Sequence, residues 1–153
     1  MSKDTLRKVV ARNRKALHEY QILESWEAGL VLKGSEVKSL REGNASLSDA
    51  FARVEHGEVW LYNMHIGPYG PAGADAHAFK RRRKLLLHRQ EIRRLIGKVE
   101  QAGLTLVPLE IYFSEGVAKL KLALARGKRH RDRREDIKQR EAEREMARAR
   151  KNR

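Results

Sequence analysis

The chain of 153 residues contains no cysteine, only three prolines, and aromatic residues that make up just 6% of the sequence. Without cysteine there can be no disulfide, no thiolate metal site and no thiol nucleophile, which fits a reducing compartment. No apolar stretch approaches the roughly 20 residues that cross a bilayer, and residues 1–20 lack the apolar core of a secretory signal. The composition predicts a soluble, cytoplasmic protein with no membrane partner.

Catalytic motifs are also missing. The sequence has no G-x-x-x-x-G-K-[ST] or G-x-S-x-G motif, and no two histidines stand four residues apart. His18 and Glu19 are neighbours, so on a strand they face opposite sides and form no ready acid–base pair. We therefore expect no enzyme, no metal site and no cofactor.

Positive charge is what the chain has in excess. There are 34 Lys and Arg against 20 Asp and Glu, a formal net charge of +14. Such a chain is drawn to polyanions, meaning nucleic acid or an anionic membrane surface, and the clustering of the cations favours nucleic acid. Residues 127–153 hold 12 of the cations and six acids. We expect an RNA-binding body over residues 1–126, its first dozen residues mobile, and a basic tail over residues 127–153.

The first half of the body has a β pattern interrupted by one short helix. Alternating apolar residues over 18–32 predict a long first strand, bent at Gly29. The segment "KGSEVKSLREG" predicts a helix that is capped by Ser35 and ended by Gly43.

A hairpin, a helix and two strands follow. "DAFARVEHGEVWLYNMHI" predicts a hairpin that turns near His56 and Gly57, and one face of its return strand is predicted to carry Trp60, Tyr62, Met64 and Ile66. "HRQEIRRLIGKVEQAG" has the apolar spacing of an amphipathic helix. "LTLVPLEIYF" predicts a strand with Pro108 at an edge or bulge, and "VAKLKLALA" predicts a strand with its lysines outward. This order predicts a mainly β fold, an OB-like antiparallel barrel flanked by short helices.

Two groups of cations in the body are candidates for RNA contact. "FKRRRKLLLHR" sets six cations, Lys84 among them, around an apolar triplet, with Phe79 and His88 available to stack on bases. A solvated charged loop is the alternative. Lys119 and Lys121 lie on the outer face of the last strand, as a phosphate-binding row or as ordinary solubilising lysines.

The tail interleaves acids and bases. Asp136 and Arg140 stand at helical spacing, and Arg144 and Arg148 continue the same face. Such pairs are too weak to hold an isolated helix in water. We expect a segment that is disordered when free and becomes a basic helix on a polyanion; a disordered solubility tail is the alternative.

Three long motifs in this order resemble the SsrA-binding protein (SmpB) family, the partner of tmRNA in bacterial ribosome rescue. They are "HEYQILESWEAGLVLKGSEVKSLREG", "RRRKLLLHRQEIRRLIGKVEQAGLTLVPLEIYF" and "LARGKRHRDRREDIKQRE". The resemblance implies a cytoplasmic, non-enzymatic, monomeric protein whose OB-like barrel holds the tRNA-like domain of tmRNA. It also implies delivery to a stalled ribosome, where the tail enters the empty mRNA channel and becomes helical.

The resemblance also implies which residues bind. Glu27, Leu86 and Lys119 match positions associated with tmRNA, and His88 stands where some relatives have Asn. To these we add the neighbouring cations Lys84 and Lys121. His18 matches a residue that faces the decoding centre, and contacts with the decoding centre and channel are expected from Gly127, Lys128, Asp132, Arg133, Arg134, Lys138 and Arg140. Arg133 replaces a family lysine, which keeps the charge but changes the donor geometry. The proline common just before the basic run is missing from "AHAFKRRRK".

The rival interpretation is a basic OB-fold protein of another kind, such as a ribosomal protein or a general single-strand binder. General binders usually present solvent-facing aromatic residues in series. Here aromatic residues are few and most of them fit core positions, which favours the first interpretation.

Overall fold

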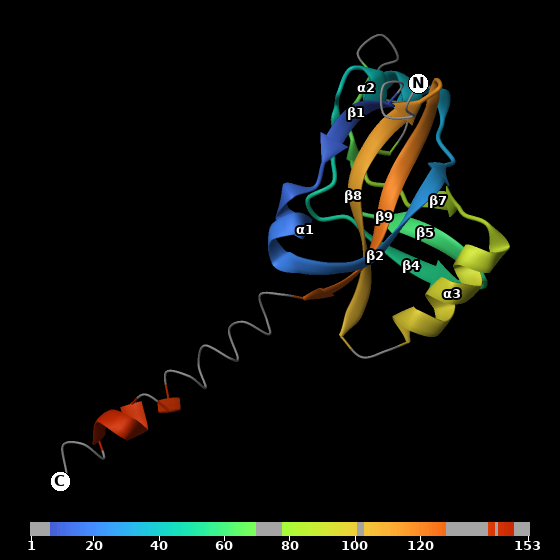
Figure 1. Ribbon diagram of the computed structural model, residues 1–153. Helices are drawn as coiled ribbons and strands as arrows, with labels where there is room; N and C mark the ends of the chain where they lie inside the picture. Colours follow the sequence, from blue (N-terminus) through green and yellow to red (C-terminus); the bar gives the residue numbers. More distant parts are fainter. Residues whose placement is uncertain (1–6, 70–77, 101–102, 128–140, 143, 149–153) are drawn as a thin grey trace.

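The computed structural model describes residues 7–69, 78–100, 103–127, 141–142 and 144–148 (Figure 1). In chain order the elements are β1 (Arg7–Arg12), α1 (Arg14–Glu19), β2 (Tyr20–Leu30), α2 (Gly34–Arg41), β3 (Ala45–Ser46), β4 (Phe51–Glu55), β5 (Glu58–Tyr62), β6 (His65–Ile66), β7 (Arg83–Leu86), α3 (Arg89–Val99), β8 (Leu104–Ser114) and β9 (Val117–Gly127). The described residues after position 140 are helical. The rest of the tail, where disorder of the free chain is predicted, lies outside the described residues.

The strands close into a ring. Strands β8, β4, β5, β7, β2 and β9 pair in that order, and β8 pairs again with β9. Strand β1 is added to β8 from outside, and the two-residue strands β3 and β6 form a separate pair. The long strands β2, β8 and β9 cross the molecule, with α3 beside the β4–β5 hairpin and α1 at the other flank (Figure 1). This confirms the predicted OB-like antiparallel barrel.

The core is built by apolar side chains that alternate with outward-pointing side chains along the long strands. On β9, Ala118, Leu120, Leu122 and Leu124 are buried inside the ring, while the two lysines between them point outward, as predicted. Strand β8 is apolar on both faces because its second face packs under α1, where Val107 and Leu109 contact Ala16. The register shifts between Pro108 and Glu110, which confirms the predicted bulge.

The beginning of the chain differs from the prediction. Arg7–Arg12 is not a mobile lead but the strand β1, which pairs with β8. Asn13 then caps α1: its side-chain oxygen accepts from the Ala16 N–H, and its amide donates to Leu47 O and Pro108 O at 3.1 and 2.9 Å. Three hydrogen bonds satisfy a side chain that is only 3% exposed. A weakly patterned segment is therefore ordered by one buried asparagine and by a strand partner about 100 residues away.

The four residues predicted to share one face of the return strand, Trp60, Tyr62, Met64 and Ile66, do not all lie on the same side. The turn does lie at His56 and Gly57, both with positive φ. However, Val59 and Leu61 are fully buried, and Trp60 and Tyr62 are on the outer face. The strand ends at Tyr62 and the chain changes direction at Asn63, which has a φ of 62°, so Met64 and Ile66 re-enter the core out of phase.

Two local signals were assigned to the wrong residue. Helix α2 begins one residue after Lys33, whose backbone N–H donates to the Glu36 carboxylate at 2.8 Å, and Ser35 lies inside the helix. The irregularity of β2 lies between Ile22 and Glu24 rather than at Gly29. Gly43, with a φ of 76°, ends α2 as predicted.

A buried ion pair joins α2 to β7. Glu36 and Arg83 are both 0% exposed, and the Arg83 Nε donates to a Glu36 oxygen at 2.5 Å. Arg81 donates to the other oxygen. The Arg83 guanidinium also donates to the carbonyls of Met64 and Phe79 at 2.6 and 3.2 Å. The prediction that this basic run lies along a phosphate backbone is therefore wrong for Arg83, because a fully buried side chain cannot reach RNA.

The pair also sets the ionisation of Glu36. Burial alone would raise the pKa of this carboxyl, but the hydrogen bonds from Arg81, the Lys33 backbone and Arg83 outweigh it and lower the pKa. A glutamate with a lowered pKa stabilises the fold above its ordinary pKa of about 4.3. That stabilisation is lost as the pH falls through the lower, folded-state value.

We predict that Arg83→Met destabilises the fold by about 3–5 kcal/mol, because it leaves a buried carboxylate with only part of its compensation. Glu36→Leu combined with Arg83→Met should recover part of the loss, since no buried charge remains. Urea unfolding at pH 7 measures both values. A double variant less stable than Arg83→Met alone would contradict this account.

Candidate RNA-binding site

Four of the predicted RNA-binding residues line one hollow on the surface. Glu27 on β2, Leu86 on β7, His88 before α3 and Lys119 on β9 surround a space of about 360 Å³. The other lining residues are Gly29, Leu30, Leu87, Glu91 and Val117. Residues up to 92 positions apart in the sequence therefore converge, which the sequence motifs alone did not establish.

Strand register explains the convergence. Gly29 on β2 is the partner of Leu86 on one side and of Lys119 on the other. A Cβ at Gly29 would lie 3.3 Å from the Cβ of Leu86, so the absence of a side chain lets β7 lie close to β2. Gly29 therefore serves the close approach of β7 to β2 rather than the predicted bend, and it lines the hollow.

Glu27 is held by a residue that sequence reasoning missed. The hydroxyl of Tyr112 on β8 donates to a Glu27 oxygen at 2.5 Å, and the ammonium of Lys119 lies 3.9 Å from the other oxygen. Burial, followed by the hydrogen bond to Glu27, raises the pKa of Tyr112 to about 12. The phenol therefore keeps its proton at neutral pH and remains a donor.

Strand β1 covers this tyrosine. The Arg7 guanidinium lies 3.7 Å above the Tyr112 ring, a cation–π contact, and pairs with Glu110. Tyr112 is only 3% exposed. A buried tyrosine needs a partner for its hydroxyl. The segment "EIYF" was predicted to be apolar on both faces, so the hydroxyl of Tyr112 in it was the signal that a polar partner lies nearby.

The hollow combines several recognition chemistries. Glu27 offers a carboxylate that accepts hydrogen bonds, and Lys119 offers a cation beside it. Leu86 presents an apolar side chain that is 53% exposed, and His88 an exposed imidazole. His88 is also the cap of α3, where its backbone N–H donates to Glu91 at 3.0 Å. Such a set suits the base and backbone of a folded RNA better than phosphates alone.

The other two predicted lysines lie around this hollow rather than in it. Lys121 on β9 is the register partner of Glu27, one step along the strand pair from the hollow. Lys84 on β7 points its ammonium toward the hairpin, 3.3 Å from the Glu58 carboxylate. Phe79, predicted to stack on bases, is 43% exposed and packs edge-on against His65 at 5.6 Å.

The residues predicted to meet the ribosome start at one end of the same strands. His18 is exposed in the last turn of α1, two residues before Tyr20, which pairs with Gly127. The base of the tail therefore lies beside the start of β2. Lys128, Asp132, Arg133, Arg134, Lys138 and Arg140 lie outside the described residues.

Within the described part of the chain, no three His, Cys, Asp or Glu side chains are grouped closely enough to hold a metal ion. In the same part, every helix is too short or too polar to cross a membrane.

Comparison with known proteins agrees with these features. Residues 10–152 match the family described as SmpB protein. The SsrA-binding proteins of Desulforudis audaxviator and Mycolicibacterium smegmatis are 60% and 59% identical to the chain. Those alignments cover 93% and 92% of this chain and 93% and 88% of the relatives.

A solved structure described as "tmRNA-SmpB: a journey to the center of the bacterial ribosome" contains a chain of the same fold. It is 57% identical, with a TM-score of 0.67, and the alignment covers 77% of this chain and 83% of that one. The family match over residues 10–152 and the 60% identity over nearly the whole chain show that the chain belongs to the SmpB family of SsrA-binding proteins.

Proposed function

We propose that this protein binds the tRNA-like domain of tmRNA and delivers it to ribosomes stalled on a message without a usable stop codon, so that the nascent peptide is tagged. The observation that carries the proposal is the meeting of Glu27, Leu86, His88 and Lys119 in one hollow of a chain that belongs to the SmpB family. Binding and delivery need no reaction at the protein, and we propose no enzymatic activity, a monomer, and action in the cytoplasm.

The role of Glu27 in this proposal is to be a fixed acceptor. A carboxylate repels phosphate, so its value in a basic surface is to accept hydrogen bonds from base N–H groups or to orient Lys119. The hydroxyl of Tyr112 holds the carboxylate from behind, and one oxygen still faces Lys119 and the hollow. A held acceptor loses little conformational entropy when RNA binds.

In this proposal the two ends of β2 have different roles, tmRNA binding at one end and ribosome contact at the other. The hollow lies at Gly29, and the base of the tail lies beside Tyr20, nine residues earlier. At roughly 3.3 Å per residue the two places are about 30 Å apart. The body of residues 1–126 can therefore hold tmRNA while His18 and the tail of residues 127–153 reach the decoding centre and the empty mRNA channel.

We predict that Glu27→Ala weakens binding of full-length tmRNA at least about tenfold, although the net charge becomes more positive. Glu24→Ala is the matched control, because it removes the same charge from the same strand but pairs with Lys98 outside the hollow. It should bind as well as the unaltered protein or slightly better. Filter binding at fixed salt measures all three, and equal weakening by both variants would contradict the proposed role.

We also predict that Tyr112→Phe weakens tmRNA binding only through Glu27. The change removes one hydroxyl and keeps the ring under Arg7. In the unaltered background the affinity should fall several-fold, and in the Glu27→Ala background it should not fall further. Additive losses in this double-mutant cycle would show that the tyrosine acts by another route.

A further prediction concerns the tail. Ordering a segment costs about 1–2 kcal/mol per residue in backbone entropy, which phosphate contacts and counterion release in an RNA-lined channel can offset. Replacing Asp132, Arg133 and Arg134 together with alanine should therefore spare tmRNA binding and abolish tagging of the nascent peptide on stalled ribosomes. A reconstituted translation system measures the tagging.

The control for this experiment is a ribosome whose message extends well past the decoding site. A filled channel should exclude the tail and block tagging by the unaltered protein. Normal tagging by the triple variant, or equal activity with the channel full, would show that the tail is only a solubility segment.

A further inference from the structure

The outer side of β4 and β5, together with the residue just before β7, carries three aromatic residues among cations. We call it the aromatic face and define it by Phe51, Arg53, Trp60, Tyr62 and Arg82. Register places Phe51 opposite Tyr62 and Arg53 opposite Trp60, so the side chains form two adjacent rows. Of the alternate residues of the same strands, Ala52, Val59 and Leu61 are buried in the core, and the half-buried Val54 packs against it.

The planar groups of this face lie over one another. The rings of Phe51 and Tyr62 are stacked, with centroids 5.5 Å apart and planes 11° apart. The Arg53 guanidinium lies 5.2 and 5.9 Å from these two rings, and the Arg82 guanidinium lies 4.1 Å from the Trp60 ring. Nucleobases stack on both kinds of surface, aromatic rings and guanidinium planes.

Charge on this face is only partly neutralised. Glu55 accepts hydrogen bonds from Tyr62 and, at 3.1 Å, from Arg82. Arg53 is exposed, and none of the ion pairs found among the described residues involves it. A protein partner would need an acidic group here, whereas RNA supplies both the phosphate for Arg53 and the flat base for the rings.

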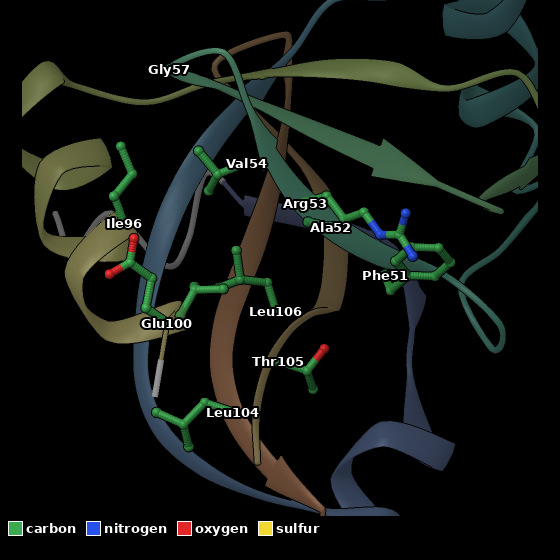
Figure 2. A pocket seen from close by; sticks show the side chains of 11 residues that line it. Phe51, Ala52, Arg53, Val54, Gly57, Ile96, Glu100, Leu104, Thr105 and Leu106 are labelled. Atoms are coloured by element: carbon green, nitrogen blue, oxygen red, sulfur yellow. The ribbon is translucent and has the colours of Figure 1, made fainter. Parts of the chain in front are cut away.

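A groove continues the aromatic face. Strand β4 is paired with β8 only at Ala52 and Leu106, and the opening between β4, β8 and α3 has a volume of about 550 Å³. Figure 2 shows Phe51 and Arg53 at one end of this groove and Ile96 and Glu100 at the other. A base displaced from a stack therefore has an apolar place beside the rings.

The aromatic face is not part of the hollow that contains Glu27. In the ring, β4 and β5 are separated from β2 and β9 by β7 on one side and by β8 on the other. The two surfaces thus lie on opposite sides of the barrel. We propose that the aromatic face is a second RNA site, which binds unpaired nucleotides by stacking their bases on Trp60 and on the Phe51–Tyr62 pair.

The chain contains a reporter for this site. It has two tryptophans, and Trp26 is 8% exposed in the core whereas Trp60 is on the aromatic face. Trp26→Phe leaves Trp60 as the single emitter in the full-length protein. The probe is an unstructured 12-nucleotide RNA, compared with an abasic strand of the same length and charge.

We expect the base-bearing RNA to quench Trp60 emission in a saturable way, and the abasic strand to leave it unchanged even where the basic tail binds it. In the same background, Phe51→Leu and Arg53→Gln should each raise the apparent Kd from this quenching roughly tenfold. Arg14→Gln, the same charge change on exposed α1, should not. Thermal unfolding confirms that each variant is folded.

Three results would overturn the proposal: no quenching by the base-bearing RNA, equal quenching by the abasic strand, or unchanged affinity of both variants. The readout is independent of tmRNA binding through Glu27. If the protein fails to bind tmRNA but shows base-dependent quenching, the proposed function is refuted and this site stands. If it binds tmRNA but shows no base-dependent quenching, the proposed function stands and this site is refuted.

Discussion

The fold depends on the carboxylate of Glu36 being shared by Arg83 on β7 and by Arg81 just before that strand. Taking a glutamate and an arginine fully out of water costs several kcal/mol each, and only complete pairing repays it. Arg83 achieves this by also donating to the carbonyls of Met64 and Phe79. The cluster therefore fixes α2, β6 and β7 relative to one another, and any other arrangement of these elements leaves a buried charge without a partner.

Strand β7 shows why that constraint matters for function. Its inward side chains, Arg83 and Leu85, belong to the core. Its outward side chain Leu86 lines the hollow with Glu27, and Arg82 just before it covers Trp60 on the aromatic face. The short segment from Arg82 to Leu86 thus contributes to both proposed RNA surfaces, and the buried pair holds it in the register that both require.

The large positive charge is distributed more selectively than its total suggests. Arg81 and Arg83 are paired with the buried Glu36, and Arg82, Lys84 and Lys98 are paired with carboxylates at the surface. In the proposed function, specificity in the body therefore rests on placed groups such as Glu27 and its donor Tyr112, not on a uniform basic coat. This fits a protein that must distinguish one folded RNA from all others.

The barrel class, the amphipathic helix α3, the hairpin turn and the outward lysines of β9 could be predicted from the sequence, because they follow from local periodicity and turn chemistry. Family motifs further indicated Glu27, Leu86, His88 and Lys119. Contacts formed in the folded chain set which cations are buried, which face of β5 points outward and which residue supports Glu27. These depend on contacts between residues 47 and 85 positions apart, and on a phase change at Asn63. A pattern of apolar and polar residues contains no information about the partner of a buried polar atom, so the chain's own folding supplies it.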